Sequence, residues 1–185
     1  SQNTAQWGNS FDLTSDIDAA TTANLDSDAG WIPIGDCSGA KFTGTFDGQG
    51  HTISNLVINR PNTNNIGLFG CADGMEITNL TLKDFEITGA DNVGALVGHI
   101  DSGDQDTGSG KIASIQVDNI TIHAGAGATG SSATGGLLGR VLSANLLIED
   151  VSTSGNIEGR QRVGGIIGSL NGNNAKFRLS SSSAD

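Results

Sequence analysis

Short hydrophobic runs separated by polar and glycine-rich stretches fill the chain, and one pattern of positions recurs among them. It reads apolar, polar, Asn or Asp, apolar, polar, apolar, and its four copies begin at Ile53, Ile77, Val117 and Ile148. Runs of this kind, rich in Ile, Val and Thr and bounded by Gly, Asn or Asp, are typical of β-strands. We therefore expect each copy to be a short strand whose apolar side chains enter a core.

A second pattern places a small residue and two bulky apolar residues between glycines. It occurs as NIGLFGC, NVGALVGHI, ATGGLLGRV and RVGGIIGSL, at residues 65–71, 92–100, 133–141 and 162–170. Neighbouring bulky residues on a strand point to opposite faces, so this strand is expected to be buried on both sides or bulged at its glycines. The small residues of the phrase would let a second layer come close.

The two patterns recur together along the chain and define a repeat. The closing glycines, Gly70, Gly98, Gly139 and Gly168, are 28, 41 and 29 residues apart. We interpret the polar stretches 101–110 and 124–134 as insertions that lengthen the middle interval. A period of this size indicates stacked repeats with about three short strands each. The sequence therefore predicts an all-β fold, a β-solenoid of the right-handed parallel β-helix type with about six coils of roughly 24–31 residues.

The polar position of the first pattern has two structural interpretations. In a solenoid, equivalent residues of successive coils lie about 4.8 Å apart, so their amides could bond along the axis as a ladder. The alternative is a set of independent turn residues that favour the left-handed conformation. The four residues concerned are Asn55, Asn79, Asn119 and Asp150.

Composition narrows the class of protein. The chain has 28 glycines in 185 residues and a formal net charge of −11. Interior glycines disfavour a helix bundle, and the acidic balance disfavours nucleic acid and anionic membranes as partners. No apolar run reaches the roughly 20 residues that span a bilayer, so we expect no membrane insertion. Because the sequence begins without Met or a signal peptide, we expect a piece of a longer protein with flanking domains.

The period also divides the chain. Residues 1–30 do not follow it and are the expected N-terminal cap, residues 31–175 form the solenoid, and residues 176–185 form a tail or the start of a linker. Cys37 and Cys71 are the two cysteines. They are either bridged, if the protein is secreted, or two small buried side chains.

Several stretches together resemble a known repeat family. FDLTSDID (11–18), GWIPIG (30–35) and KFTGTFDGQGHTISNLVINRP (41–61) precede the glycine phrases. This arrangement resembles the GLUG-motif regions of bacterial secreted and cell-surface proteins. The resemblance implies an extracellular or cell-surface location, in large adhesin-like proteins or beside the peptidase domain of some immunoglobulin A peptidases. The chain matches no peptidase motif, so no catalytic residue carries over.

The expected function is therefore that of an adhesin or stalk module in a larger bacterial extracellular protein, and not of an enzyme. It would bind a surface glycan or protein through irregular loops, or act as a rigid spacer. Insertions in repeat proteins map to loops on one face, so the ligand-binding candidates are Asp101, Asp104 and Asp106. Trp31, one of two tryptophans, is expected to pack against a core end and not against a ligand.

Calcium is the one cofactor that the sequence suggests. Asp26 and Asp28 belong to one D-x-D-x-G stretch, Asp104 and Asp106 belong to another, and Asp101 precedes the second. Alternating acids on a glycine-containing loop can present oxygens to Ca²⁺. The alternative is a pair of solvated acidic loops, as a net charge of −11 would also produce.

The alternative function is a polysaccharide lyase or hydrolase of β-helix type. It needs two carboxylates on neighbouring coils, and a lyase also needs a basic residue. The histidines His51, His99 and His123 are scattered, and we expect no metal cluster among them. The candidate acidic and basic residues are Asp84, Glu86, Asp118, Asp150, Arg140, Arg160 and Arg162.

Overall fold

The computed structural model describes residues 4–101, 110–125, 132–142, 145–171 and 176–178. This part of the chain is mostly β, with two short 3-10 helices near its start, η1 (Thr4–Gln6) and η2 (Ala20–Asn24). Every pair of strands in its sheets is parallel. The expected all-β class with parallel strands is confirmed.

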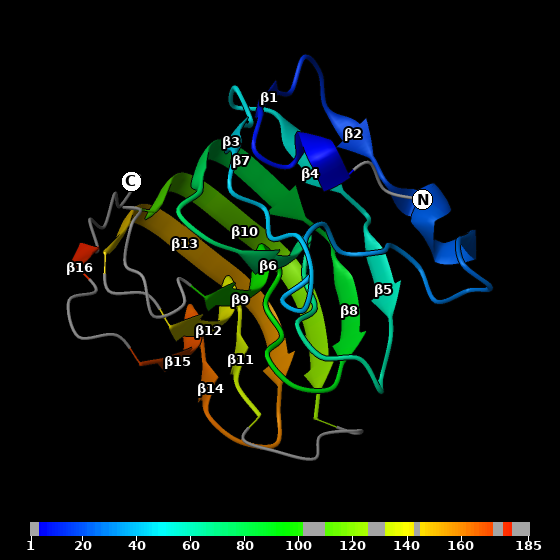
Figure 1. The fold of residues 1–185 in the computed structure, drawn as a ribbon. Helices are drawn as coiled ribbons and strands as arrows, with labels where there is room; N and C mark the ends of the chain where they lie inside the picture. Colours follow the sequence, from blue (N-terminus) through cyan, green and yellow to red (C-terminus); the bar gives the residue numbers. More distant parts are fainter. Residues whose placement is uncertain (1–3, 102–109, 126–131, 143–144, 172–175, 179–185) are drawn as a thin grey trace, which may run out of the picture.

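The largest sheet of the described part has ten strands, and Figure 1 shows β7, β10 and β13 lying side by side in it. Its main path is β1 (Ser10–Asp12), β3 (Thr45–Asp47), β7 (Glu76–Lys83), β10 (Gly110–Ala124), β13 (Leu146–Glu158) and β16 (Lys176–Arg178). Beside this path lie β2 (Ile17–Asp18), β4 (Thr52–Ser54), β5 (Val57–Asn59) and β8 (Glu86–Gly89).

Each strand of the main path pairs with a strand about one repeat further along the chain. The paired residues run Ser10, Thr45, Glu76, Lys111, Leu147 and Lys176. Their residue numbers differ by 35, 31, 35, 36 and 29. The predicted repeat of 24–31 residues, which sets the expected insertions aside, is too short at the first step, whereas the other two long steps contain the expected insertions. We call the part of the chain between one of these paired residues and the next a level of the stack.

A second sheet carries the glycine phrases. It consists of β6 (Phe69–Ala72), β9 (Val97–Asp101), β12 (Leu138–Leu142) and β15 (Ile167–Leu170). Its register aligns Phe69, Val97, Leu138 and Ile167, as the sequence predicted. A two-stranded sheet of β11 (Thr134–Gly135) and β14 (Val163–Gly164) precedes β12 and β15 along the chain.

The glycines of this sheet permit close backbone packing. A Cβ on Gly98 would lie 2.4 Å from the backbone C of Asn65 and 2.4 Å from the N of Ile66. Both bulky residues of the phrase are buried in the first three copies, for example Leu96 and Val97. The first of the two lies just before the strand begins, as Leu96 does before β9, so the burial of both residues is confirmed without one strand carrying both.

The predicted polar column is wrong in one respect: its four residues occupy two columns. Lys83 pairs with Ser54 and with Asp118, so Asp84 stands in register with Asn55 and Asn119. Asn79 and Asp150 instead share a column with Ser114. All six of these residues have positive φ, between 51° and 58°. The pattern occurs twice per level, five residues apart, and the sequence alignment matched first occurrences with second ones.

Side-chain hydrogen bonds do link successive levels at these positions, but they run from Asn amides to Asp carboxylates and not from one Asn to the next. Asn119 Nδ2 donates to Asp84 Oδ1 at 2.6 Å, and Asn79 Nδ2 donates to Asp47 Oδ1 at 3.0 Å. A single ladder of Asn55, Asn79, Asn119 and Asp150 therefore does not form. The turn interpretation accounts for the positive φ of all four.

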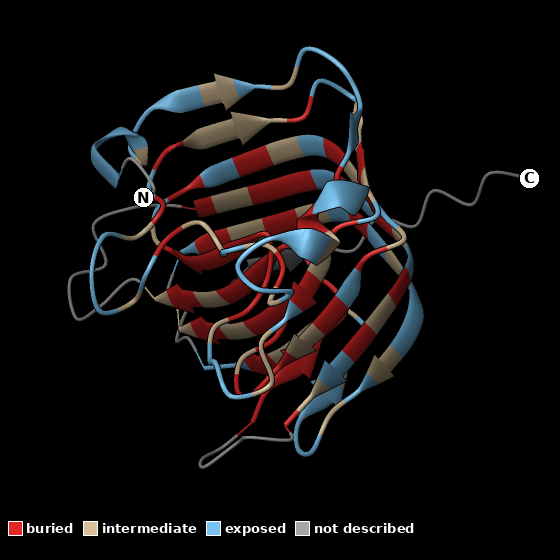
Figure 2. Cartoon of the chain, turned by 90° about the vertical axis from the view of Figure 1, so that its right-hand side faces the viewer, coloured by how far each residue is buried: buried red, intermediate tan, exposed pale blue. Residues whose placement is uncertain are grey.

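The core lies between the sheets and is built from stacked apolar columns. One column holds Ile77, Ile112 and Ile148, each no more than 1% exposed. Figure 2 shows buried positions running through the middle of the stack and exposed positions at its first strands. The large exposed hydrophobic residues come from the first and last parts of the described chain; they are Ile17, Leu25, Ile32, Val163 and Leu170.

Residues of the expected N-terminal cap take part in the sheet, since β1 and β2 pair with β3 and β4. Of the expected insertions, residues 102–109 and 126–131 lie outside the described residues, as do residues 179–185 of the expected tail. The domain boundaries stay a prediction. Within the described part, no helix has the length and apolar character needed to cross a membrane.

Candidate functional site

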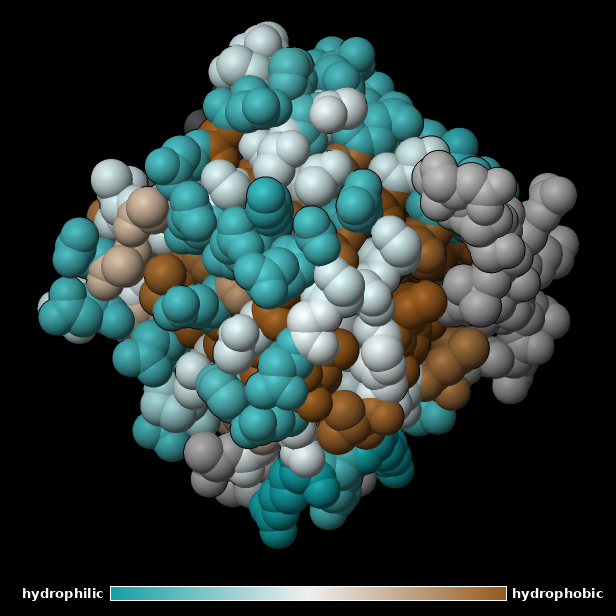
Figure 3. Space-filling view, turned by 180° about the vertical axis from the view of Figure 1, so that it is seen from behind, coloured by the Kyte–Doolittle hydropathy of each residue, from teal (hydrophilic) through white to brown (hydrophobic). Residues whose placement is uncertain are grey.

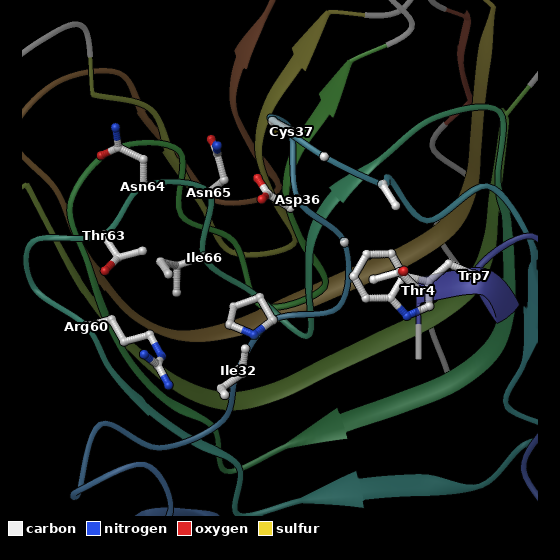
Figure 4. A pocket seen from close by; sticks show the side chains of 14 residues that line it. Thr4, Trp7, Ile32, Asp36, Cys37, Arg60, Thr63, Asn64, Asn65 and Ile66 are labelled. Carbon is white, nitrogen blue, oxygen red and sulfur yellow. The ribbon is translucent and has the colours of Figure 1, made fainter. Parts of the chain in front are cut away.

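A groove of about 610 Å³ opens near the N-terminal end of the stack. Figure 4 shows Thr4 and Trp7 on one side of it and Arg60, Thr63 and Ile66 on the other. Its lining combines an indole, aliphatic side chains, amides, hydroxyls and one carboxylate. The residues that line it are Thr4, Trp7, Ile32, Pro33, Gly35, Asp36, Cys37, Gly39, Ala40, Arg60, Thr63, Asn64, Asn65 and Ile66.

The groove is held by hydrogen bonds between segments that are distant in sequence. Arg60 ties two of them: its Nε donates to Trp31 O at 3.0 Å, and its Nη2 donates to Asp26 Oδ2 at 2.6 Å. Asn65 Oδ1 accepts from Asn92 Nδ2 at 2.9 Å, and Asn64 Oδ1 accepts from the Asp91 amide. The groove wall is thereby fixed before any ligand arrives.

The loop at residues 36–40 is a compact turn. The Asp36 amide donates to Ala40 O at 2.8 Å, and Asp36 Oδ1 accepts from the Ser38 amide at 2.9 Å. These bonds leave the second oxygen of Asp36 for a ligand. Among the described residues that line the groove, Asp36 is the one carboxylate and Arg60 the one cation.

A smaller aromatic pocket of about 270 Å³ shares Trp7 with the groove. Six of the eight aromatic residues of the chain line it. Trp31 is half-buried, packs against the core and donates from Nε1 to Leu68 O at 3.1 Å, which confirms its expected role at a core end. The lining consists of Gln6, Trp7, Phe11, Trp31, Ile34, Phe42, Phe46 and Phe69.

Two cysteines and a histidine meet beside the groove. Cys37 and Cys71 form a disulfide with a Cα–Cα distance of 5.2 Å, so the bridged alternative is the one adopted. His99 Nδ1 lies 3.5 Å from Cys37 Sγ. The ligand atoms of the three side chains lie within 4.8 Å of one another, a grouping that the sequence did not predict.

This cluster had a readable signal in the sequence. Cys71, His99, Arg140 and Ser169 each follow the closing glycine of a phrase, and the register pairs Cys71 with His99 and His99 with Arg140. Burial lowers the pKa of His99 below its usual 6.5, and the charges of Arg140 and Lys41 lower it further. The opposing effect of Asp101 is smaller than that of burial.

The structure does not gather the expected calcium ligands that it describes. Asp26 binds Arg60, and Asp101 Oδ2 lies 2.9 Å from Lys41 Nζ. Asp104 and Asp106 lie outside the described residues. The group of potential metal ligands found within the described ranges is Cys37, Cys71 and His99 and includes none of these aspartates.

The residues of the enzyme alternative are spread over two sheets. Asp84 and Asp118 stand near one another in the ten-stranded sheet, where Asp84 Oδ1 accepts from Asn119 and Asp118 Oδ1 from Ser154. Arg140 lies on β12 of the other sheet. Glu86 begins β8, and Asp150 is exposed on β13.

The remaining two histidines pair with acids on the surface. His51 Nδ1 lies 3.1 Å from Asp16 Oδ1, and His123 Nδ1 lies 3.0 Å from Glu158 Oε2. The hydrogen bond from the Thr52 backbone amide is the largest cause that lowers the pKa of Asp16 below 3.8, and the hydrogen bond to His51 is the next largest. The hydrogen bond from Asn156 is the largest cause that lowers the pKa of Glu158 below 4.5, and the hydrogen bond to His123 is the next largest.

Known proteins resemble this chain over much of its length. No protein-family model matches it. It is 36% identical over 146 residues to halomucin of Haloquadratum walsbyi, a region that is 76% of this chain and 1% of halomucin. It is 35% identical over 120 residues to a protein of Evansella cellulosilytica described as a Gly-rich membrane protein, a region that is 64% of this chain and 12% of that protein.

A solved structure shares the fold. A Bacteroides ovatus protein described as an immunoglobulin A1 protease superposes with a TM-score of 0.57 and 20% identity, over 92% of this chain and 57% of that chain. At this identity the likeness concerns the fold alone. The chain thus corresponds to a small fraction of each of these two sequence relatives and to about half of the solved chain.

Proposed function

We propose that the chain is a right-handed β-solenoid module of a larger extracellular or cell-surface protein, and that it binds a glycan in the groove beside Trp7. The parallel register of six successive levels supports the solenoid. Connections between parallel strands of one sheet are right-handed in nearly all proteins, which supports the handedness.

The location is supported by the resemblance of the sequence to GLUG-motif regions and by the names of its relatives. Halomucin and a Gly-rich membrane protein are both names that fit the outside of a cell. The disulfide between Cys37 and Cys71 also fits, because disulfides persist in oxidising compartments.

The observation that carries the binding function is the composition of the groove. A sugar ring has an apolar face, which packs on an aromatic side chain, and a rim of hydroxyls, which need polar partners. Trp7 supplies the aromatic side chain, and Asp36, Thr63 and Asn64 supply carboxylate, hydroxyl and amide groups around the same opening. Binding sites typically combine an apolar lining with a few placed polar groups in this way.

The charge of the protein favours a neutral glycan. The formal net charge is −11, and hydrophilic residues cover much of the face in Figure 3. The electrostatic field of a protein with this negative net charge repels polyanions, so uronic-acid polymers are disfavoured as ligands. Arg60 does not offset this, because its guanidinium already binds Asp26.

The test is a glycan array that carries neutral and uronic-acid-containing glycans. We expect binding to neutral glycans and its loss in Trp7→Ala. Thr63→Arg should also abolish binding, since it places a long side chain at the mouth of the groove from an exposed position. The matched control is Thr14→Arg, an exposed threonine that does not line the groove. Equal binding by Thr63→Arg and the wild type would overturn the proposal.

The same assay separates the other candidate functions. A rigid spacer would bind no glycan. A polysaccharide-active enzyme would shorten the glycan that it binds, and chromatography of a bound oligosaccharide would reveal the products. We expect binding without products, because Asp36 stands alone among the carboxylates described in the groove, whereas glycoside hydrolysis needs two.

A further inference from the structure

Cys37, Cys71 and His99 come from three separate elements and converge on one point. Cys37 belongs to the loop that lines the groove, Cys71 lies on β6, and His99 lies on β9 directly beside Cys71. Two sulfurs and an imidazole are the ligands that soft divalent cations such as Zn²⁺ prefer.

The surroundings suit a metal site in two ways. Cys71 is fully buried, and Cys37 and His99 are half-buried, so solvent reaches the cluster from the Cys37 side. The His99 ring turns Nδ1 toward Cys37 Sγ at 3.5 Å, and its other nitrogen, Nε2, is buried without a hydrogen-bond partner among the described residues. Because the ligand atoms of all three side chains lie within 4.8 Å of one another, a single cation could contact them together.

We propose that this cluster is a redox-gated metal site, closed as the disulfide and open to one Zn²⁺ in the dithiol form. A dithiol reductant would supply two electrons and two protons, would itself become a disulfide, and would leave thiols at Cys37 and Cys71. One Zn²⁺ then replaces the two thiol protons and binds the two thiolates and the His99 ring, with water as fourth ligand.

The backbone is compatible with this change. Zn–S distances of about 2.3 Å place two sulfurs of a tetrahedral site roughly 3.7 Å apart. The Cα atoms of Cys37 and Cys71 are 5.2 Å apart, and rotation about the Cα–Cβ bonds can separate the sulfurs by that amount. Cys37 also lines the groove, so the metal would sit at its edge.

The test uses the whole chain and Co²⁺ as a spectroscopic probe. A phosphine, which is oxidised to its oxide with oxygen from water, reduces the disulfide, and the protein is titrated with Co²⁺. We expect one Co²⁺ per chain with visible bands of a tetrahedral site and a thiolate-to-cobalt charge-transfer band. His99→Gln should weaken the affinity by at least about tenfold. The matched control His123→Gln, whose histidine is exposed and binds Glu158, should not change it.

A second measurement does not depend on the spectrum. Zn²⁺ should raise the melting temperature of the reduced wild type and not that of reduced His99→Gln, since an ion that binds the native state stabilises it. The inference is wrong if the reduced protein binds no cobalt, if His99→Gln binds as tightly as the wild type, or if the oxidised protein binds equally well.

Discussion

Single residues decide how closely the levels approach one another, and the glycine phrases show this most directly. Gly98 and Gly165 both belong to these phrases, but their surroundings differ. A Cβ on Gly98 would meet the backbone of Asn65 and Ile66 at 2.4 Å, whereas the nearest atom to a Cβ on Gly165 is Thr153 Oγ1 at 4.0 Å. Ala95 already fills the position equivalent to Gly165 in the second copy of the phrase.

Gly98→Ala should therefore lower the free energy of unfolding by about 1–3 kcal/mol, because the added methyl forces two backbones apart. Gly165→Ala should change it by less than about 0.5 kcal/mol. Urea unfolding of both variants checks this. Equal losses in the two variants would show that the close approach at Gly98 is not what the phrase preserves.

Acid sensitivity also belongs to single residues. The folded pKa of Asp16 is lowered, so its contribution to stability is present above pH 3.8 and is lost as the pH falls through the folded pKa. His51→Ala should raise the pKa of Asp16 only part of the way to 3.8, because the Thr52 amide remains the larger cause. Carboxyl NMR titration measures this. His123→Ala is the control, and it should raise the pKa of Glu158 and leave that of Asp16 unchanged.

At the scale of elements, the sequence predicted the glycine phrases well and the polar column poorly. The glycine phrase occurs once per level, so aligning its letters aligns the strands. The apolar–polar–Asn pattern occurs twice within β7 and its following turn, around Asn79 and again around Asp84. Letters alone cannot distinguish the two occurrences, and only the pairing of strands fixes which one stands above which.

The candidate site could not be predicted in the same way. Trp7, Asp36 and Arg60 belong to different segments, and no period connects them. The cysteine–histidine cluster was partly readable, since Cys71 and His99 both follow closing glycines. Cys37 was not, because the loop that carries it lies outside the aligned phrases.

The disulfide ties the 36–40 loop to β6, and its loss should be measurable. Cys37→Ala with Cys71→Ala should lower the free energy of unfolding by about 2–4 kcal/mol, as expected for a bridge that spans 34 residues. Chemical denaturation of the double variant and of the reduced, metal-free wild type should give similar losses. An unchanged stability in both would mean that the bridge does not hold the loop.

At the scale of the molecule, 20 acidic residues stand against 9 basic ones, so like charges repel one another across the stack. With a net charge of −11, repulsion between levels should weaken as salt screens it. Raising NaCl from low to high concentration should therefore raise the melting temperature, by about 2–4 °C for each kcal/mol gained. A fall in melting temperature would contradict this.

The expected calcium loops can be tested separately from screening. The melting temperature is measured in CaCl₂ and in NaCl at equal ionic strength, and Asp104→Asn, which lacks one of the expected ligands, is the control variant.

The central claim is that the chain advances by one level every 29–36 residues in parallel register, because the groove and the metal cluster both depend on it. Disulfide trapping tests this most directly. Gln116 and Ser152 are exposed partners on β10 and β13, so Gln116→Cys with Ser152→Cys should cross-link under mild oxidation. Gln116→Cys with Leu147→Cys, which the sequence alignment alone would pair, should not, because the register separates them by about 16 Å. Peptide mapping that found the second cross-link and not the first would contradict the account.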